Sequence, residues 1–314
     1  MKNIKFLIQA FIAILVLSAC RPDDSPRSAD TRDANVVQAE DLLELQGFLN
    51  THFYNYEEFQ ANPTADLEVL FDTIQGANSS KIPLFQQVEA KILRRGGIDY
   101  TYYILKARQG LGSGSATFAD SALVSYKGYL TDRTIFDAIS NPVWFDLPRD
   151  VFVQGFTAGV IEFNDALNAV QQPDGIITFE GSGVGAVFMP SGLAYFNRTQ
   201  VNIPAYTPLI FTLQIRKTTA ADHDGDGILS MFEDLDGDNR VNTPNGDDTN
   251  RNGLFNYLDA DDDGDGRSTR SEITVRNADG TIVRDANGNP LLDPTIDTDN
   301  DGIPDYLDNN TIGQ

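Results

Sequence analysis

The chain has 314 residues and a formal net charge of −23, because 46 Asp and Glu outnumber 23 Lys and Arg. A chain this acidic repels polyanions, so we exclude nucleic acid as a partner. Cys20 is the single cysteine, which leaves no second thiol for a disulfide and no thiol cluster for a metal.

The N-terminus has the pattern of a signal peptide. Lys2 and Lys5 precede an apolar run over residues 6–17, which is shorter than the ~20 residues needed to span a bilayer. The run ends in Leu-Ser-Ala-Cys at residues 17–20, which resembles a bacterial lipoprotein signal. The resemblance implies that residues 1–19 are removed and that Cys20 carries the lipid that anchors the chain to a membrane. An ordinary secretory signal, with Cys20 incidental, is the alternative.

The segment after the signal has the composition of a tether. Residues 20–39 are mostly polar and include two prolines, which is typical of a flexible linker. Asp23 and Asp24 resemble the acidic export signals of Bacteroidetes surface lipoproteins. We therefore expect an outer membrane lipoprotein, located either on the periplasmic face or at the cell surface.

Residues 40–95 are predicted to form a helical arm. Leu42, Leu45 and Leu49 share one stripe of an amphipathic helix, which we expect to dock on the next domain. The rest of the arm could support a homodimer or hold a substrate. A simple packing extension is the alternative.

Residues 96–217 have the pattern of an α+β domain. Residues 122–129 and 208–215 carry the β-branched and aromatic side chains of strands with one buried face, and we expect them to pair antiparallel. Residues 143–147 predict a further short strand, and residues 151–160 a turn that leads into a short helix. The predicted fold is an antiparallel sheet curled around this helix.

Several motifs in this domain occur in one order. They are Tyr126 in Val-x-Tyr-x-Gly, Phe136-Asp137, Val153-Gln-Gly-Phe156, Leu193-Ala-Tyr195, and Ile203-Pro204 followed by Phe211. Over residues 98–216 the chain thereby resembles the FK506-binding-protein (FKBP) family of peptidyl-prolyl cis-trans isomerases. The resemblance implies catalytic roles for Asp137, Tyr195 and Phe136, and a substrate pocket formed by Tyr126, Val153, Phe156, Ile203 and Phe211.

Such a pocket would act without a cofactor. The barrier of ~18–20 kcal/mol to peptide-bond rotation comes from amide resonance, which water strengthens by hydrogen-bonding the carbonyl oxygen. An apolar pocket that removes this water and holds the amide twisted lowers the barrier without a nucleophile. Proline-containing polypeptides are the expected substrates, because only X-Pro bonds populate both isomers and exchange slowly.

Three positions depart from the family pattern. Phe156 replaces the tryptophan of the pocket floor, Phe196 replaces a glycine, and residues 164–185 replace a short turn with an insertion that could reshape the pocket rim. We therefore keep two alternatives to an isomerase: a non-catalytic proline-binding scaffold, and a calcium-dependent surface adhesion protein.

Residues 218–314 contain 23 Asp and Glu, six Arg and no Lys, a net charge of −17. The acidic residues repeat with the spacing of a calcium loop: oxygen ligands at positions one, three and five, a glycine at six and a carboxylate at twelve. Hard oxygen ligands in this number suit Ca²⁺, in a structural role. The predicted ligands are Asp222, Asp224, Asp226, Glu233, Asp248, Asn250, Asn252, Asp259, Asp261, Asp263, Asp265, Glu272, Asp297, Asp299, Asp301 and Asp308.

The loops lack the flanking helices of an EF-hand, because Asp234 follows the first loop directly and Pro304 lies inside the last. The segment resembles thrombospondin type 3 repeats, which implies an irregular region whose successive loops share ions. Residues 273–292 contain turn signals and predict an inserted hairpin. Small apolar contacts between the loops are expected from Ile228, Phe232, Leu254, Tyr257, Ile303 and Tyr306.

Overall fold

The computed structural model describes residues 31–151, 153–244 and 246–310. Cys20 and the predicted signal peptide lie outside these residues. The chain from Ala34 onward forms one unit, separate from the segment before it. Across the described ranges, no helix combines the length and the hydropathy that crossing a bilayer requires.

A six-stranded antiparallel sheet forms the centre of the fold. Its strand order is β3-β4-β9-β10-β5-β6. The expected pairing of residues 122–129 with 208–215 is confirmed, because β5 lies next to β10 in the sheet. The strands are β3 Val88–Arg95, β4 Ile98–Arg108, β5 Ser121–Tyr129, β6 Ile135–Asp146, β9 Gly183–Met189 and β10 Leu209–Thr219.

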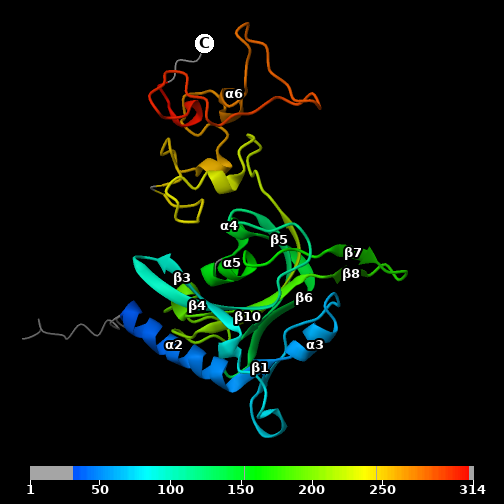
Figure 1. Cartoon of the computed structure of the whole chain (residues 1–314). Helices are drawn as coiled ribbons and strands as arrows, with labels where there is room; N and C mark the ends of the chain where they lie inside the picture. The colour runs from blue at the N-terminus through cyan, green and yellow to red at the C-terminus, as the bar shows by residue number, and fades with distance from the viewer. Residues whose placement is uncertain (1–30, 152, 245, 311–314) are drawn as a thin grey trace, which may run out of the picture. The chain divides into compact units, whose positions relative to one another are not determined.

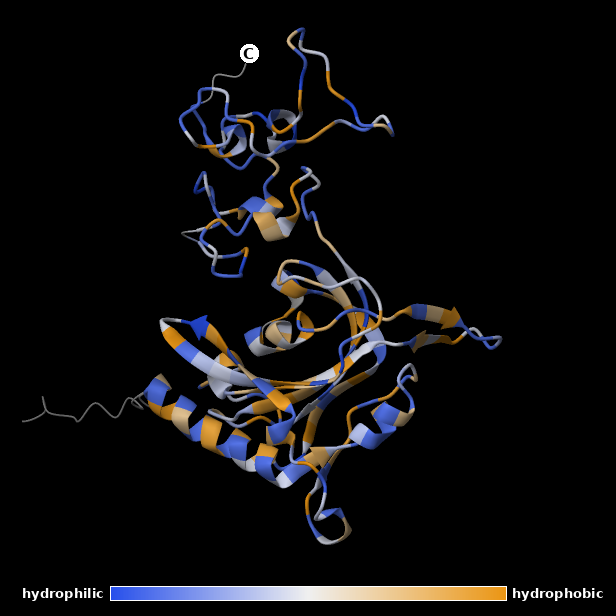
Figure 2. Ribbon diagram, in the orientation of Figure 1, coloured by the Kyte–Doolittle hydropathy of each residue, from blue (hydrophilic) through white to orange (hydrophobic). Residues whose placement is uncertain are grey.

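Two helices cover opposite faces of this sheet (Figure 1). The short helix α5 (Gln154–Val160) packs on one face, where Phe156 and Val160 join the larger apolar core. The long helix α2 (Ala34–Thr51) packs on the other face through Leu45, Phe48 and Leu49. Figure 2 shows the alternation of apolar and polar residues along α2 that permits this packing. The predicted α+β class, with an FKBP-like sheet on one short helix, is confirmed.

The arm differs from its prediction at both ends. Helix α2 begins at Ala34, six residues before the predicted start, so part of the predicted tether is helical. Strand β3 lies within the predicted arm and forms one edge of the main sheet. Between them lie β1 His52–Tyr54, α3 Tyr56–Ala61, β2 Phe71–Thr73 and two 3₁₀ turns, η1 Gly76–Asn78 and η2 Leu84–Gln86.

The insertion after α5 forms a hairpin of its own. Strands β7 (Asn168–Gln171) and β8 (Ile177–Glu180) pair antiparallel and project from the main sheet in Figure 1. The last residues of the predicted insertion, from Gly183, already belong to β9. The predicted short strand at residues 143–147 is the end of the long strand β6, which runs into α4 (Leu147–Asp150).

Helix α2 also fixes the loop that follows β9. Asp41 is only 3% exposed, and its Oδ2 accepts hydrogen bonds from the Ser191 backbone N–H at 2.8 Å and from the Ser191 hydroxyl at 2.6 Å. Ser191 begins the 3₁₀ turn η3 (Ser191–Leu193), which leads directly to Tyr195. The helix therefore positions a predicted site residue.

Asp41 should make stability depend on pH. Burial raises the pKa of Asp41 to about 6, above its ordinary value, against the opposing effect of its bonds with Ser191. Between pH ~4 and ~6 the folded chain then binds a proton that the unfolded chain lacks, so stability falls as pH rises through this window. We expect Asp41→Asn to gain about 1–3 kcal/mol relative to wild type between pH 4 and pH 7.

Urea unfolding in saturating calcium measures this difference. The matched control is Asp174→Asn, in the exposed turn of the β7–β8 hairpin, which should follow the wild-type curve. Parallel curves for wild type and Asp41→Asn across the window would refute the ionisation of a buried Asp41.

The described part of the acidic region is irregular, as predicted, with turns, short helices and isolated bridges. Within the described residues it contains η4 Ser230–Phe232, η5 Asn256–Leu258, α6 Thr269–Glu272 and η6 Asp305–Leu307. The inserted hairpin is present as three isolated antiparallel bridges, from Thr274–Leu292 to Arg284–Pro290.

Only half of the expected apolar contacts between the loops form. Ile228, Tyr257 and Tyr306 are buried, whereas the other three predicted residues are exposed. The exposed residues are Phe232 at 61%, Leu254 at 42% and Ile303 at 44%. Leu254 and Ile303 follow the glycine of their loops at position seven. Ile228 occupies the same position but packs with Ile273 and Tyr306.

Candidate functional site

An apolar pocket of about 120 Å³ opens on the face of the sheet that α5 covers. All three residues with an expected catalytic role line it, together with four of the five expected substrate-binding residues. Its lining is Tyr126, Phe136, Asp137, Phe145, Val151, Val153, Phe156, Tyr195 and Phe211.

Three residues depart from the expected lining. Ile203 is buried in the same apolar core but does not line the pocket. Phe145 and Val151 line it without having been predicted. Phe145 comes from the far end of β6, and the alternation of that strand cannot be followed from the sequence because its register against β5 shifts twice.

Gly128 explains why an aromatic ring lies over strand β5. It pairs with Phe211 on one side and with Asp137 on the other. A Cβ atom at position 128 would lie 2.5 Å from the ring of Phe136, so any larger residue would displace that ring. The glycine of the Val-x-Tyr-x-Gly motif therefore gives Phe136 its place in the pocket.

Phe156 forms the centre of the aromatic lining. Its ring centroid lies 5.3 Å from those of Tyr126 and Phe211, and 5.6 Å from that of Phe145. The rings of Tyr126 and Phe211 meet it edge to face, an arrangement that aromatic pairs favour. Phenylalanine thus supplies the floor of the pocket where the family pattern has tryptophan.

Two hydroxyl groups and one carboxylate are the polar groups of the lining. The Tyr126 hydroxyl donates to Oδ2 of Asp137 at 2.5 Å. Burial, followed by this bond, raises the pKa of Tyr126. Burial and the charge of Asp137 also raise the pKa of Tyr195. Both tyrosines therefore remain proton donors at neutral pH.

The acidic loops share one pattern of backbone hydrogen bonds. In the loops that begin at Asp222, Asp261 and Asp297, the first carboxylate accepts from the backbone N–H groups of positions four and six. The side chain at position three accepts from position five, and position five accepts from position seven. The loop at Asp248 repeats most of this pattern. The carboxylate at position one therefore has both oxygens held by backbone N–H groups, whereas in these bonds the side chains at positions three and five use one oxygen each.

A second regularity links positions two and nine, which the calcium-loop spacing does not include. Side chains at these positions bond in the pairs His223–Ser230, Thr249–Asn256, Asp262–Thr269 and Thr298–Asp305. In all four loops the backbone N–H of position nine also donates to the carbonyl of the residue before the loop. These bonds close each loop on itself with little hydrophobic core.

Buried carboxylates meet between the first and third loops. Oxygens of Asp226, Glu233 and Asp262 lie within 4.8 Å of one another, and all three residues are buried. Both oxygens of Glu233 lack a hydrogen-bond partner, as do one oxygen each of Asp226 and Asp262. Three buried carboxylates that together have four oxygens without a hydrogen-bond donor fit a divalent cation with oxygen ligands. Asp262 was not among the predicted ligands, because it occupies position two of its own loop.

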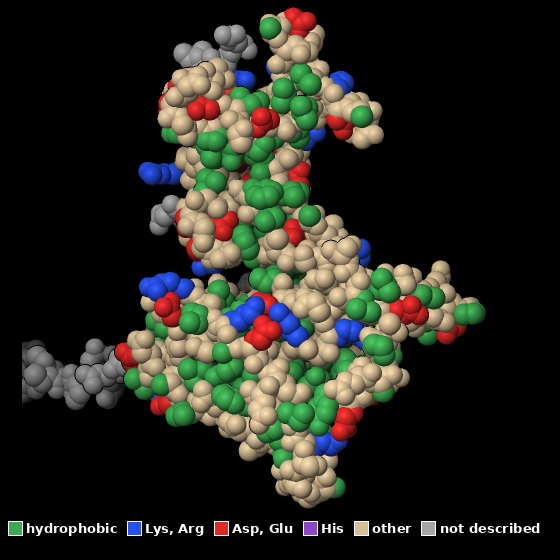
Figure 3. Space-filling model, viewed as in Figure 1, with side chains coloured by type: hydrophobic (Ala, Val, Ile, Leu, Met, Phe, Trp, Pro, Cys, Tyr) green, Lys and Arg blue, Asp and Glu red, His purple; other side chains and the backbone are tan. Residues whose placement is uncertain are grey.

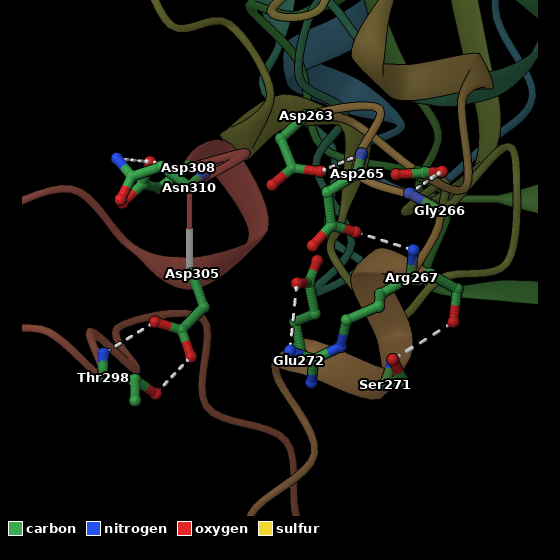
Figure 4. A network of polar contacts seen from close by, with 12 residues as sticks. Asp263, Asp265, Gly266, Arg267, Ser271, Glu272, Thr298, Asp305, Asp308 and Asn310 are labelled. Atoms are coloured by element: carbon green, nitrogen blue, oxygen red, sulfur yellow. Dashed lines mark hydrogen bonds and ion pairs between the residues drawn. The ribbon is translucent and has the colours of Figure 1, made fainter. Parts of the chain in front are cut away.

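The third loop has a comparable arrangement. Figure 4 shows the carboxyl groups of Asp263, Asp265 and Glu272 next to one another, with Arg267 beside them. Both oxygens of Glu272 lack a hydrogen-bond partner. Burial, then the charges of Asp263 and Asp265, raises the pKa of Glu272 to about 8. These carboxylates suit a bound cation, and Glu272 would complete its coordination shell.

The remaining predicted ligands divide into two groups. In the first and last loops, Asp222, Asp224 and Asp226, and Asp297, Asp299 and Asp301, each form a cluster that could hold a metal ion. In the loop at Asp248, the amides of Asn250 and Asn252 instead donate to Asp259 at 3.1 and 2.9 Å. Asp234, Asp236 and Asp238 have the spacing of the first three ligand positions and also form a cluster, although they were not among the predicted ligands.

Comparison with known proteins gives one family match. The family model described as BamM C-terminal matches residues 223–284, within the acidic region. This description differs from the thrombospondin type 3 repeats that the loops resemble. A search of the curated proteins finds no match.

Solved structures with a similar fold include prolyl isomerases. A peptidyl-prolyl cis-trans isomerase of Pseudomonas syringae pv. tomato has 16% identity and a TM-score of 0.35, over 60% of this chain and 97% of the other. FkpA from Escherichia coli has 18% identity and a TM-score of 0.33, over 69% and 72%. The N-terminal domain of FKBP42 from Arabidopsis thaliana has 14% identity and a TM-score of 0.32, over 42% and 92%.

Proposed function

We propose that this chain is a peptidyl-prolyl cis-trans isomerase that acts on X-Pro bonds of proteins of the bacterial envelope. The observation that supports this proposal is the pocket itself. Its apolar lining converges on Phe156, and Asp137 and Tyr195 are its polar groups besides Tyr126. An apolar cavity that can hold a proline ring next to a fixed carboxylate has the parts that amide rotation requires.

Each part of the pocket would have one task. Phe156 would support the proline ring, and Phe136 and Phe211 would flank it. Removal of water from the amide would weaken its resonance and thereby lower the rotation barrier. The Tyr195 hydroxyl would donate a hydrogen bond to a substrate carbonyl, and Asp137, oriented by Tyr126, would face the rotating amide.

The test is the isomerisation rate of an X-Pro tetrapeptide by the full chain in mild detergent and saturating calcium. We expect turnover above background, and a reduction of kcat/KM by about tenfold or more in Asp137→Ala, because a hydrogen bond to a charged group contributes ~1.5–3 kcal/mol. Tyr195→Phe should reduce kcat/KM less, because it removes a neutral hydrogen bond.

The matched control is Asp132→Asn, which changes an exposed Asp in the turn before β6 and should retain full turnover. If the wild type shows no turnover with several different residues before proline, the isomerase function is excluded. Binding of the same peptides without turnover would instead assign the pocket to a proline-binding scaffold.

We further propose that the acidic loops bind structural calcium and that a lipid on Cys20 anchors the chain at the outer membrane. The buried carboxylate oxygens that lack a hydrogen-bond donor support the first of these proposals. The lipoprotein signal at residues 17–20 supports the second. Metabolic labelling with a fatty acid, compared between wild type and Cys20→Ser, tests the anchor.

A further inference from the structure

A second, larger cavity adjoins the proposed proline pocket. Its volume is about 660 Å³, and Val151 and Tyr195 line both cavities. A polypeptide whose proline occupies the smaller pocket would therefore extend past this larger cavity, at ~3.3–3.6 Å per residue. Side chains within about four residues of the proline could reach it.

Arginines from four separate segments line this larger cavity. Arg95 ends β3, Arg149 belongs to α4, Arg198 follows η3, and Arg240 belongs to the acidic region. No Asp or Glu is among the lining residues. In a chain with twice as many acidic as basic residues, a cavity lined by four arginines and no carboxylate is a distinct chemical feature.

The positive charges in this cavity are poorly compensated. Among the described residues, no ion pair includes Arg95, Arg198 or Arg240, although the charge of Arg240 partly opposes the burial that raises the pKa of the nearby Asp238. Arg149 pairs with Asp146 at 3.8 Å. Burial, then the charges of Arg240 and Arg198, lowers the pKa of Arg95. The guanidinium groups therefore lie close enough to repel one another.

The fold holds these arginines next to the site. Nη1 of Arg95 donates to the carbonyl of Gly192 at 2.8 Å, three residues before Tyr195. The Asn242 amide donates to the carbonyl of Pro148 at 3.3 Å. This bond joins the segment that contains Arg240 to the segment that contains Arg149. On the face drawn in Figure 3, Lys and Arg side chains, with Asp and Glu among them, lie on the part of the sheet domain next to the acidic loops.

We propose that this arginine cavity selects substrates with Asp or Glu within about four residues of the isomerised proline. Guanidinium groups bind carboxylates through charge-assisted hydrogen bonds, and a cavity of one sign concentrates the opposite charge. The inference rests on the proposed isomerase function, whose substrate class it narrows.

The experiment uses three X-Pro peptides that differ only in carrying Glu, Gln or Lys near the proline, with the full chain in saturating calcium. At about 50 mM salt we expect kcat/KM for the Glu peptide to exceed that for the Gln peptide about tenfold, and the Lys peptide to be slowest. The advantage should shrink at about 500 mM salt, because salt screens exposed charges.

A matched pair of double variants locates the effect. Arg198→Gln with Arg240→Gln should abolish the preference for Glu and leave turnover of the Gln peptide unchanged. Arg94→Gln with Arg284→Gln makes the same change in net charge at exposed positions outside the cavity, and should keep the preference. Equal rates for the Glu and Gln peptides, or a preference that survives the first double variant, would overturn the proposal.

Two further measurements keep the outcomes separate. If no peptide is turned over, the isomerase function fails, and binding of the three peptides by calorimetry still tests the cavity. Vesicles containing phosphatidylglycerol serve as the second probe. Binding to these vesicles that depends on Arg198 and Arg240, without a preference for the Glu peptide, would assign the cavity to anionic lipid and overturn the proposal.

Discussion

Withdrawal of calcium should unfold residues 222–308 and leave the sheet domain folded. The reason is the density of buried carboxylates in the loops. Burial and neighbouring carboxylates raise the pKa of Glu233, and likewise that of Asp262. Without a cation these groups either remain protonated or repel one another. At a free calcium concentration of ~100 times the Kd, each bound ion would contribute about 2.7 kcal/mol to the stability of the folded loops.

The sign of the pH dependence should reverse with calcium. In a chelator, the raised pKa values mean that the folded loops bind more protons than the unfolded chain, so loop stability falls as pH rises from about 4 toward 8. In calcium the ligands must be ionised, so stability rises over the same range. Hydrogen–deuterium exchange of loop peptides at pH 5 and pH 8, with and without chelator, measures both trends.

Glu233→Gln is the sharpest variant for this prediction. It removes the charge of the carboxylate that lies between the first and third loops. We expect calcium affinity to fall on the order of 10–100-fold, because the glutamine offers the cation only a neutral oxygen. A polar interaction with a charged group contributes ~1.5–3 kcal/mol. Glu180→Gln, exposed at the end of β8, is the matched control and should bind calcium as wild type.

Two results would contradict the calcium proposal. One is identical exchange of the loop peptides in calcium and in chelator. The other is equal calcium affinity of wild type and Glu233→Gln, which would place the cation away from the buried carboxylates. Loss of protection in the sheet domain on chelation would show instead that the two regions unfold together.

The sequence predicted the central strands because their patterns are local. Residues 122–129 alternate as a half-buried strand does, and β5 occupies 121–129. Strand β3 escaped prediction because it is an edge strand in which Glu89, Lys91 and Arg94 are interspersed with apolar residues. Helix α2 was predicted to begin late because its first turn lies next to a polar, proline-containing segment and has no acidic residue.

The site residues were predictable where one motif contains them and not where distant segments meet. Phe136 and Asp137 are adjacent in sequence, whereas Phe145 reaches the same pocket through the register shifts of β6. In the loops, spacing predicted the carboxylates that cluster within a repeat. It could not identify Asp262, because the proximity of Asp262 to Glu233 depends on how one loop packs against another.

Phe156→Ala should abolish most of the isomerase activity. Compared with a control in the core, this variant distinguishes the role of the pocket in activity from the role of the core in stability. Phe156 is 4% exposed and contacts three other rings of the lining. Loss of its apolar surface would remove about 2–3 kcal/mol of contact with the twisted proline amide, which corresponds to a reduction of kcat/KM by roughly 30–160-fold. The same change should destabilise the domain by about 3–5 kcal/mol.

Phe163→Ala is the control that distinguishes these two effects. Phe163 is 1% exposed in the same core, but it packs against Gly183 and Gly185 and does not line the pocket. It should destabilise the domain as much as Phe156→Ala and keep kcat/KM close to that of wild type when rates are corrected for the folded fraction. An equal loss of activity in both variants would mean that activity follows core stability, so that Phe156 would have no specific role as the floor of a proline pocket.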